Sequence, residues 1–452
     1  MEDTIVAIST ALGVGAISIV RVSGKDSISI VNQIFDGKDL KKVNSHTIHY
    51  GKIVENKQEI DEVLVSVMKS PRTYTMEDIV EINCHGGIAT TNKVLELLLT
   101  KGCRLARPGE FTERRFLNGK IDFIQAQGIK DLIDAKTDET RILALNQVNG
   151  KVSQMIEAIR QQILEKVVAQ IEVNIDYPEY EDIKQLTNND ILPSLEEILN
   201  KMKKILAESR NGVMIKEGIK TSIIGRPNVG KSSLLNALIE ENKAIVTDIE
   251  GTTRDIVEGE IRIDGISFHI IDTAGIRKSD NLVEQIGVQK SLELIENSEL
   301  VLFVLNNNET LTQSDIEILD KLKEKETIII INKKDLEQKL EIEKLPIKDC
   351  IFISALVQEG MEDVKNKMRE LFQLEQIKTE DPTYLTNANS IAFLKNAISH
   401  IEDAIHGIEQ DFPIDMVEID VKTAWEELGS IIGKTYQDEL IHQLFSQFCL
   451  GK

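Results

Sequence analysis

The feature that most constrains the fold of this chain is a glycine-containing loop between a short apolar strand and a helix. Residues 219–224 read as a buried strand, residues 225–232 read GRPNVGKS, and residues 233–238 carry apolar side chains at helical spacing. Gly225 and Gly230 allow backbone angles and close approaches that a side chain would block. Consecutive backbone NH groups can therefore turn towards an anion at the helix N-terminus, and the pattern predicts a phosphate-binding loop.

The side chains of this loop have predicted roles on a nucleotide. Lys231 can add a positive charge beside the outer phosphates, and Ser232 can offer its hydroxyl to Mg²⁺. The loop residues that we expect to contact the nucleotide are Asn228, Val229, Gly230, Lys231, Ser232 and Ser233. The alternative is a glycine loop that matches the pattern by chance, which the flanking strand and helix disfavour.

Length and charge limit the class of protein. At 452 residues the chain is too long for one ordinary core, and roughly three domains are expected. It has 53 Lys and Arg against 75 Asp and Glu, a net charge of −22, and only 4% of its residues are aromatic. A protein that holds nucleic acid by neutralising many phosphates should be basic. Any RNA contact is therefore expected to be local or supplied by a partner.

The cysteines and the apolar runs favour a cytoplasmic protein. The cysteines are far apart and form no paired CxxC, which argues against a disulfide framework or a zinc cluster; they are Cys84, Cys103, Cys350 and Cys449. No basic start followed by an apolar run is present, and nothing approaches 18 consecutive apolar residues. We therefore expect a soluble cytoplasmic protein with no membrane partner.

The pattern of predicted strands and helices changes three times along the chain, which predicts a multidomain protein. Residues 1–118 alternate short strands and helices, as in an α+β domain with a small sheet. Residues 119–212 and 381–452 carry long helices, and strands and helices alternate over residues 213–380, as in a doubly wound α/β sheet. One all-α domain interrupted by an inserted α/β module is the economical interpretation, although two separate helical pieces fit the periodicity as well.

Some boundaries of elements can also be predicted. A helix that begins near Leu192 should run to Ser209 and end at Asn211 and Gly212, because glycine commonly follows the last helical turn. The strands expected in the first domain lie at residues 17–22, 46–50, 63–68 and 79–83.

A second nucleotide motif follows another apolar strand. Asp272 and Gly275 belong to the sequence DTAG, which stands directly after Ile271 and about 45 residues beyond the phosphate loop. The carboxylate of Asp272 can reach the magnesium ion, and the backbone NH of Gly275 can bind the terminal phosphate.

A third motif, at the end of a later strand, predicts guanine as the base. Asp335 can accept from both the ring NH and the exocyclic amine of guanine, Asn332 fits its acceptor edge, and the stem of Lys333 can pack along the base. The stretch Ser354, Ala355 and Leu356 follows the next strand and can present a backbone NH to the guanine oxygen. Adenine would leave Asp335 unpaired, so GTP is favoured over ATP. A solvated charged loop is the alternative for this motif taken alone.

Together these motifs resemble the translation-factor-like class of P-loop GTPases. The chain departs from the Ras pattern after Gly275, where Ile276 replaces the glutamine that orients the attacking water. An aliphatic side chain cannot do this, so water activation must come from elsewhere.

The whole chain resembles the MnmE (TrmE) family of tRNA modification GTPases. Besides the nucleotide motifs, the stretches that carry the resemblance are residues 3–7 (DTIVA), 84–87 (CHGG), 106–112 (ARPGEFT), 116–120 (FLNGK) and 449–452 (CLGK). The resemblance implies a tetrahydrofolate-binding and dimerisation domain over residues 1–118, a Ras-like G domain over 213–380 and a helical domain in two parts, the second ending in a CxGK motif.

The resemblance also implies a potassium site. The residues that correspond to the family's potassium ligands are Asn228, Thr247, Ile249 and Thr252, and Thr253 joins Ser232 on Mg²⁺. Potassium can neutralise charge between the outer phosphates, where other GTPases use an arginine. The family's catalytic glutamate, which orients water through a bridging water, corresponds to Glu284. A turn residue and a surface carboxylate are the alternatives for Asn228 and Glu284.

Two further sites follow from the resemblance. Arg21, Glu81 and Lys120 are assigned to the pterin and the glutamate tail of 5,10-methylenetetrahydrofolate or 5-formyltetrahydrofolate, although each fits a solvated charge equally well. Cys449 and Lys452 belong to the CxGK motif, and the cysteine of that motif is needed for modification in the family. A cysteine beside an apolar helix face more commonly packs as a small hydrophobe.

The expected function is a potassium-stimulated GTP hydrolase that forms a homodimer. With a flavoprotein partner resembling MnmG (GidA), it would take part in (carboxymethyl)aminomethyl modification of carbon 5 of the tRNA wobble uridine, and the partner would bind most of the tRNA. The alternative is a GTPase switch in ribosome assembly or signalling, whose flanking domains serve only as interaction modules.

Overall fold

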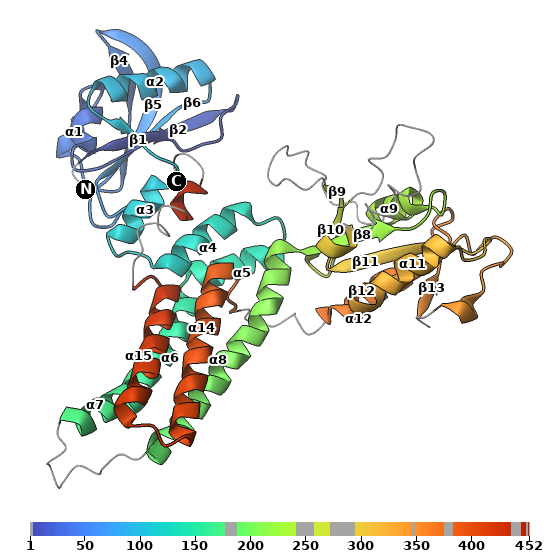
Figure 1. Ribbon diagram of the computed structural model, residues 1–452. Helices are drawn as coiled ribbons and strands as arrows, with labels where there is room; N and C mark the ends of the chain where they lie inside the picture. The colour runs from blue at the N-terminus through green and yellow to red at the C-terminus, as the bar shows by residue number, and fades with distance from the viewer. Residues whose placement is uncertain are drawn as a thin grey trace. The chain divides into compact units, whose positions relative to one another are not determined.

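The computed structural model describes residues 3–176, 188–240, 257–271, 294–345, 349–374, 383–434, 444–448 and 451. The chain divides into two compact units (Figure 1). The first comprises Met1–Asp134, Ala144–Lys203 and Ala388–Lys452, and the second comprises Ala135–Leu143 and Lys204–Asn387. The second unit is thus inserted into the sequence of the first.

The first unit begins with a seven-stranded sheet. In their order across the sheet, the strands are β3 (Phe35–Asp36), β4 (Thr47–Glu55), β5 (Gln58–Met68), β6 (Ile79–His85), β2 (Ile17–Ser23), β1 (Ile5–Ile8) and β7 (Arg104–Leu105). All neighbours are antiparallel except β1 and β7. The four predicted strands are confirmed, but the sheet is larger than predicted. β1 is wholly buried and shows no alternation, while β3 and β7 are only two residues long.

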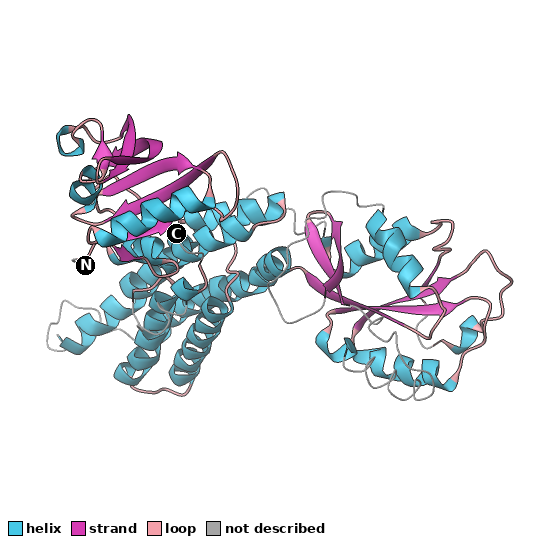
Figure 2. Ribbon diagram, turned by 90° about the horizontal axis from the view of Figure 1, so that it is seen from above, coloured by secondary structure: helices cyan, strands magenta, loops and turns pink. Residues whose placement is uncertain are grey.

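Alternation along β5 separates a buried face of this sheet from an exposed one. Val63, Val65 and Val67 enter the core of the domain, whereas Leu64 and its cross-strand partner Tyr50 remain exposed. The helices that contact this sheet are α1 (Ser27–Asn32) and α2 (Ile88–Thr100), and Figure 2 shows helices beside the strands. One face of the sheet therefore packs against the core, and the other carries exposed apolar side chains.

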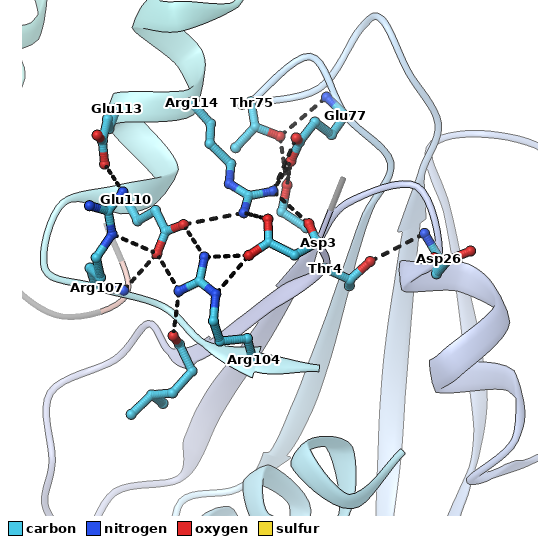
Figure 3. Close-up of polar contacts among 12 residues, drawn as sticks. Asp3, Thr4, Asp26, Thr75, Glu77, Arg104, Arg107, Glu110, Glu113 and Arg114 are labelled. Carbon is cyan, nitrogen blue, oxygen red and sulfur yellow. Dashed lines mark hydrogen bonds and ion pairs between the residues drawn. The ribbon is translucent and has the colours of Figure 1, made fainter. Parts of the chain in front are cut away.

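Helix α3 (Glu110–Leu117) is fixed to the sheet by a buried ion network (Figure 3). The buried guanidinium of Arg114 donates to carboxylate oxygens of Asp3, Glu77 and Glu110 at 2.8, 3.1 and 3.2 Å. Arg104 binds Asp3 and Glu110 at 2.7 and 2.6 Å. Burial is the largest influence and raises the pKa of Glu110, but the hydrogen bonds from Arg104, the Arg107 NH and Arg114, together with the charge of Arg104, outweigh it and hold that pKa below its usual range. The network therefore joins the start of β1 to α3 through ionised groups.

Helices from both sides of the inserted unit in the sequence build the rest of the first unit. The elements of this part of the chain are α4 (Phe123–Asp134), α5 (Asp138–Val148), α6 (Lys151–Ile163), the π-helical turn η2 (Leu164–Val168), α7 (Ala169–Asp176), α8 (Asn188–Glu217), α14 (Ala388–Glu409) and α15 (Ile414–Ile431). Two of them, α5 and α8, also contribute residues to the second unit. α6 and α15 are far apart in sequence but pack together. Arg160 of α6 donates to the carbonyl of Trp425 in α15 at 3.2 Å and lies 4.1 Å from the centre of its ring.

The predicted end of α8 at Asn211 and Gly212 is wrong, because the helix continues to Glu217. Gly212 serves packing instead of termination, since a Cβ there would lie 2.6 Å from the Cβ of Tyr384. The glycine that ends the helix is Gly218, with φ 72° and its NH bonded to the carbonyl of Met214 at 3.0 Å.

The second unit contains a six-stranded sheet. In order, its strands are β13 (Cys350–Phe352), β12 (Glu326–Asn332), β11 (Leu300–Asn306), β8 (Ile219–Ile224), β10 (Ile266–Ile271) and β9 (Val257–Ile263). Every pair is parallel except β9 with β10, as expected for a doubly wound sheet closed by a hairpin. Apolar clusters cover both faces: α9 (Lys231–Glu240) and α12 (Met361–Leu371) pack on one, and α11 (Gln313–Lys321) packs on the other. Figure 2 shows helices on both sides of this sheet.

Three short 3₁₀ turns complete the described elements: η1 (Leu40–Lys42), η3 (Leu322–Glu324) and η4 (Ile342–Lys344). Within the described part of the chain, no helix combines the length and the apolar character needed to cross a membrane.

We predict that Arg114→Met destabilises the N-terminal sheet domain by about 3 to 5 kcal/mol, because it leaves buried carboxylates without their cation. Amide hydrogen exchange of peptides from α3 and β1 should report the loss. The matched control is Arg141→Met, since Arg141 forms an exposed ion pair with Asp138 and should contribute about 1 kcal/mol or less. Equal effects of the two substitutions would refute the structural role of the network.

Candidate functional site

The phosphate loop lies between β8 and α9, at the carboxyl end of the parallel strands. Gly225 has φ 146°, and a Cβ there would lie 2.3 Å from the carbonyl oxygen of Val304 in β11. Asn228 and Gly230 also have positive φ, at 64° and 99°. The loop therefore requires the conformations for which its glycines were singled out.

Lys231 spans the loop from its end to its start. Its ammonium group donates to the backbone carbonyls of Gly225 and Arg226 at 2.7 and 2.8 Å. Ser232 and Ser233, the next two residues of α9, are exposed. The structure thus places the ammonium group of Lys231 at the start of the loop and the hydroxyls of Ser232 and Ser233 at the N-terminus of α9.

Asn332, at the end of β12, connects the phosphate loop to the loop that follows β13. Its side-chain nitrogen donates to the carbonyl of Val229 at 2.8 Å, and its side-chain oxygen accepts from the NH of Ala355 at 3.0 Å. A Cβ at Gly230 would lie 2.1 Å from the same side-chain nitrogen. The sequence analysis predicted a base contact for Asn332 and missed this bridging role.

Asp335 is oriented by the next loop. Its carboxylate accepts from the hydroxyl of Ser354 at 2.6 Å, and a carboxylate so held keeps acceptor sites for the two donors of guanine. Lys333 adopts φ 64°, and Lys334 pairs with Glu359 at 2.6 Å across the two loops.

The backbone NH groups of Ser354 and Ala355, which were predicted to reach the guanine oxygen, have hydrogen-bond partners within the chain. The NH of Ser354 donates to the carbonyl of Glu359 at 3.0 Å, and that of Ala355 is bound by Asn332. A β-bridge between Ser354 and Glu359 closes the loop and uses the first of these groups. The side chain of Leu356, which follows, is 83% exposed at the tip of the same loop.

Nine of the predicted site residues lie outside the described residues. They are Thr247, Ile249, Thr252, Thr253, Asp272, Gly275, Glu284, Cys449 and Lys452. The strand that leads to Asp272 is described: β10 runs parallel to β8, with Ile271 opposite Ser222. The carboxyl end of β10 therefore lies beside the carboxyl end of β8, from which the phosphate loop begins.

A second candidate site surrounds Tyr74 in the N-terminal sheet domain. Arg21 and Glu81 face each other across β2 and β6 and form an ion pair at 2.8 Å. The Arg21 guanidinium lies 5.7 Å from the centre of the Tyr74 ring, and that of Arg115 lies 4.7 Å from it. Lys120 donates to the carbonyl of Thr73. The three predicted folate residues thus gather around one loop.

Arg115 gives this second site an unsatisfied donor. Its Nε is buried and has no hydrogen-bond partner among the described residues. Partial burial and the neighbouring charge of Arg115 lower the pKa of Lys120. Sequence reasoning missed Tyr74, Phe111 and Arg115, although the last two belong to or adjoin motif stretches that carry the family resemblance.

The end of the chain reaches this second site. The carbonyl oxygen of Gly451 accepts from Arg21 at 3.4 Å and from the hydroxyl of Ser9 at 3.0 Å. Before it, Phe445 and Phe448 pack in one apolar cluster with Phe116 of α3. The described residues on both sides of Cys449 therefore lie against the N-terminal sheet domain or α3.

Comparison with known proteins identifies relatives over the full length of the chain. The family model "GTP-binding protein TrmE N-terminus" matches residues 4–120, and the model "MnmE helical domain" matches residues 123–449. The chain is 52% identical to the tRNA modification GTPase MnmE of Bacillus cytotoxicus and 50% identical to that of Streptococcus thermophilus. Each alignment covers 100% of this chain, with 99% of the first protein and 98% of the second.

Solved structures match a smaller part of the chain. The G domain of the FeoB iron transporter from T. maritima is 26% identical, covering 34% of this chain and 99% of that domain, with a TM-score of 0.26. Aquifex aeolicus Era bound to GDP·AlF4⁻ is 22% identical, covering 40% of this chain and 66% of that protein, also with a TM-score of 0.26. The full-length relatives and the two family models show that the chain belongs to the MnmE (TrmE) family of tRNA modification GTPases, enzymes that hydrolyse GTP.

Proposed function

We propose that the chain is a potassium-stimulated GTPase that modifies carbon 5 of the tRNA wobble uridine in the cytoplasm. It acts as a homodimer with a flavoprotein partner resembling MnmG (GidA) and uses a tetrahydrofolate one-carbon donor. The observation that carries the proposal is the group of residues around Tyr74, where Arg21 contacts the Tyr74 ring, Glu81 and the carbonyl of Gly451. A GTPase that served only as a switch would have no use for such a site.

The described residues of the phosphate loop suit the metal ions of this proposal. Asn228 and Ser232 are exposed and carry amide and hydroxyl oxygens, the kind of ligand that K⁺ and Mg²⁺ take. When bound, the two ions supply positive charge against the phosphates. Lys231 contributes a further charge from the side chain, and Asp335, oriented by Ser354, selects guanine. Glu284 is proposed to orient the attacking water.

The residues around Tyr74 suit a reduced folate. Glu81, held by Arg21, can accept from the amino group and ring NH of a pterin, and Tyr74 offers a ring for stacking. Arg115 and Lys120 are cations suited to the glutamate tail, and the buried Nε of Arg115 is a donor without a partner among the described residues. When bound, the folate supplies the one-carbon unit. The hydrogen bond between Arg21 and Gly451 supports a role for the neighbouring Cys449 and Lys452 at this site.

The surface of the chain is consistent with the proposed partners. Ile48 and Tyr50 of β4 are 66% and 64% exposed, and with Leu64 they form an apolar patch on the open face of the sheet that a second copy could cover. The net charge of −22 leaves most of the tRNA contact to the flavoprotein partner.

The candidate site around Tyr74 predicts saturable binding of 5-formyltetrahydrofolate to the full chain. Arg21→Ala should weaken binding at least about tenfold, because it removes the group that orients Glu81 and lines the Tyr74 ring. Isothermal titration measures the effect. Lys52→Ala, which breaks an exposed ion pair with Glu59 on the same sheet, should leave affinity unchanged. Absence of binding up to millimolar ligand would favour the switch over the modifying enzyme.

The potassium site predicts a cation effect on turnover. GTP hydrolysis should be at least about tenfold faster in KCl than in NaCl at equal ionic strength, since only an ion of fitting size neutralises charge between the phosphates. Asn228→Ala should remove most of this difference. Equal rates of the original chain in the two salts would eliminate the role given to Asn228.

The proposed catalytic carboxylate makes a separate prediction. Glu284→Ala should slow GTP hydrolysis on the order of 100-fold or more while sparing nucleotide affinity, because it removes only the group that orients water. Single-turnover hydrolysis and binding of a fluorescent GDP analogue provide the two measurements. Loss of affinity together with hydrolysis would instead assign Glu284 a structural role.

A further inference from the structure

Arg226 is a positive charge inside the phosphate loop for which the sequence analysis proposed no function. It directly follows Gly225 and precedes the residues that approach the phosphates. An arginine in such a place can act in two ways. It can stabilise charge on the phosphate being transferred, or it can hold the loop in place.

The contacts of Arg226 point away from the first role. Its Nε lies 3.0 and 3.1 Å from the two carboxylate oxygens of Asp315, and a terminal nitrogen lies 3.1 Å from a carboxylate oxygen of Glu309. The same nitrogen lies 3.5 Å from the carbonyl oxygen of Thr310. Two carboxylates therefore balance one guanidinium, and its positive charge is already paired within the chain.

Asp315 makes this anchor rigid. The residue is fully buried and forms a capping box with Thr312 at the start of α11, accepting from the Thr312 NH at 2.9 Å and from its hydroxyl at 2.8 Å. A buried carboxylate is costly without a cation, and Arg226 supplies it. The same carboxylate thus begins a helix and holds the phosphate loop.

The loop is consequently fixed at two points. Arg226 holds its start to α11, and Asn332 holds the carbonyl of Val229 further along. The two anchors are connected, because Asn306 at the end of β11 binds Glu309 and stands opposite Asn332 in β12. The start and the middle of the loop therefore share one supporting frame.

We propose that Arg226 is a positioning residue of the GTPase reaction. Through Asp315 and Glu309 it fixes the start of the phosphate loop, and so sets how tightly the loop holds the phosphates of both GTP and GDP. It does not stabilise the charge that develops on the transferred phosphate.

The experiment compares Arg226→Ala, Arg226→Lys and Asp315→Asn in the full chain. Affinity and dissociation rate are measured with N-methylanthraniloyl-GDP and its GTP counterpart, and kcat and KM are measured for GTP. Arg226→Ala should weaken both affinities about tenfold through faster dissociation, with kcat at saturating GTP within about threefold. Asp315→Asn, which keeps the shape of the capping residue, should reproduce this pattern, and Arg226→Lys should restore part of the affinity.

Three controls make the outcome decisive. Lys323→Ala removes an exposed ion pair with Asp320 just beyond α11 and should change neither affinity nor kcat. The double variant Arg226→Ala with Asp315→Asn should bind nucleotide no more weakly than Arg226→Ala alone, because both substitutions remove the same ion pair between Arg226 and Asp315. A fall in kcat of about 10³-fold with affinity retained would overturn the proposal and make Arg226 the transition-state cation. Unchanged affinity and kcat would overturn it too, and if Arg226→Ala does not fold, Arg226→Lys decides by the same two readouts.

Discussion

The nucleotide site depends on one side-chain amide. Asn332 binds the carbonyl of Val229 with its nitrogen and the NH of Ala355 with its oxygen, so it joins loops that follow three parallel strands. Gly230 must be a glycine for this contact, because a Cβ would lie 2.1 Å from the Asn332 nitrogen. The loop geometry, the base motif and the glycine are consequently parts of a single constraint, and a change in any one disturbs the others.

The N-terminal sheet domain follows a related design. Arg114, Glu110 and Asp3 form a buried ion network that fixes α3 against the start of β1 (Figure 3). Because α3 carries Phe111 and Arg115, the same network holds two residues of the candidate site around Tyr74. In both units a buried polar group with several hydrogen bonds supports the residues proposed to bind ligands, so less conformational entropy is lost when a ligand binds.

The sequence predicted what depends on local pattern and missed what depends on distant contacts. The apolar runs predicted β8 at its observed bounds and the end of β10 at Ile271, since a strand in the core leaves a local run of apolar residues. The end of α8 was mispredicted at Gly212, because the sequence does not distinguish a glycine that permits packing against Tyr384 from one that ends a helix. The role of Asn332, the engaged NH of Ala355 and the meeting of Arg21 with Gly451 join residues 23 to 430 positions apart, which no local pattern records.

The charge around Tyr74 argues for an anionic ligand on physical grounds. Arg21, Arg115 and Lys120 gather there in a chain whose net charge is −22, and Glu81 is the carboxylate that pairs with Arg21. Gathered cations repel one another, and the lowered pKa of Lys120 reflects partial burial together with the charge of Arg115. A concentration of cations in an acidic chain is the arrangement expected where a bound anion completes the charge balance, so it agrees with the anionic ligand proposed for this site.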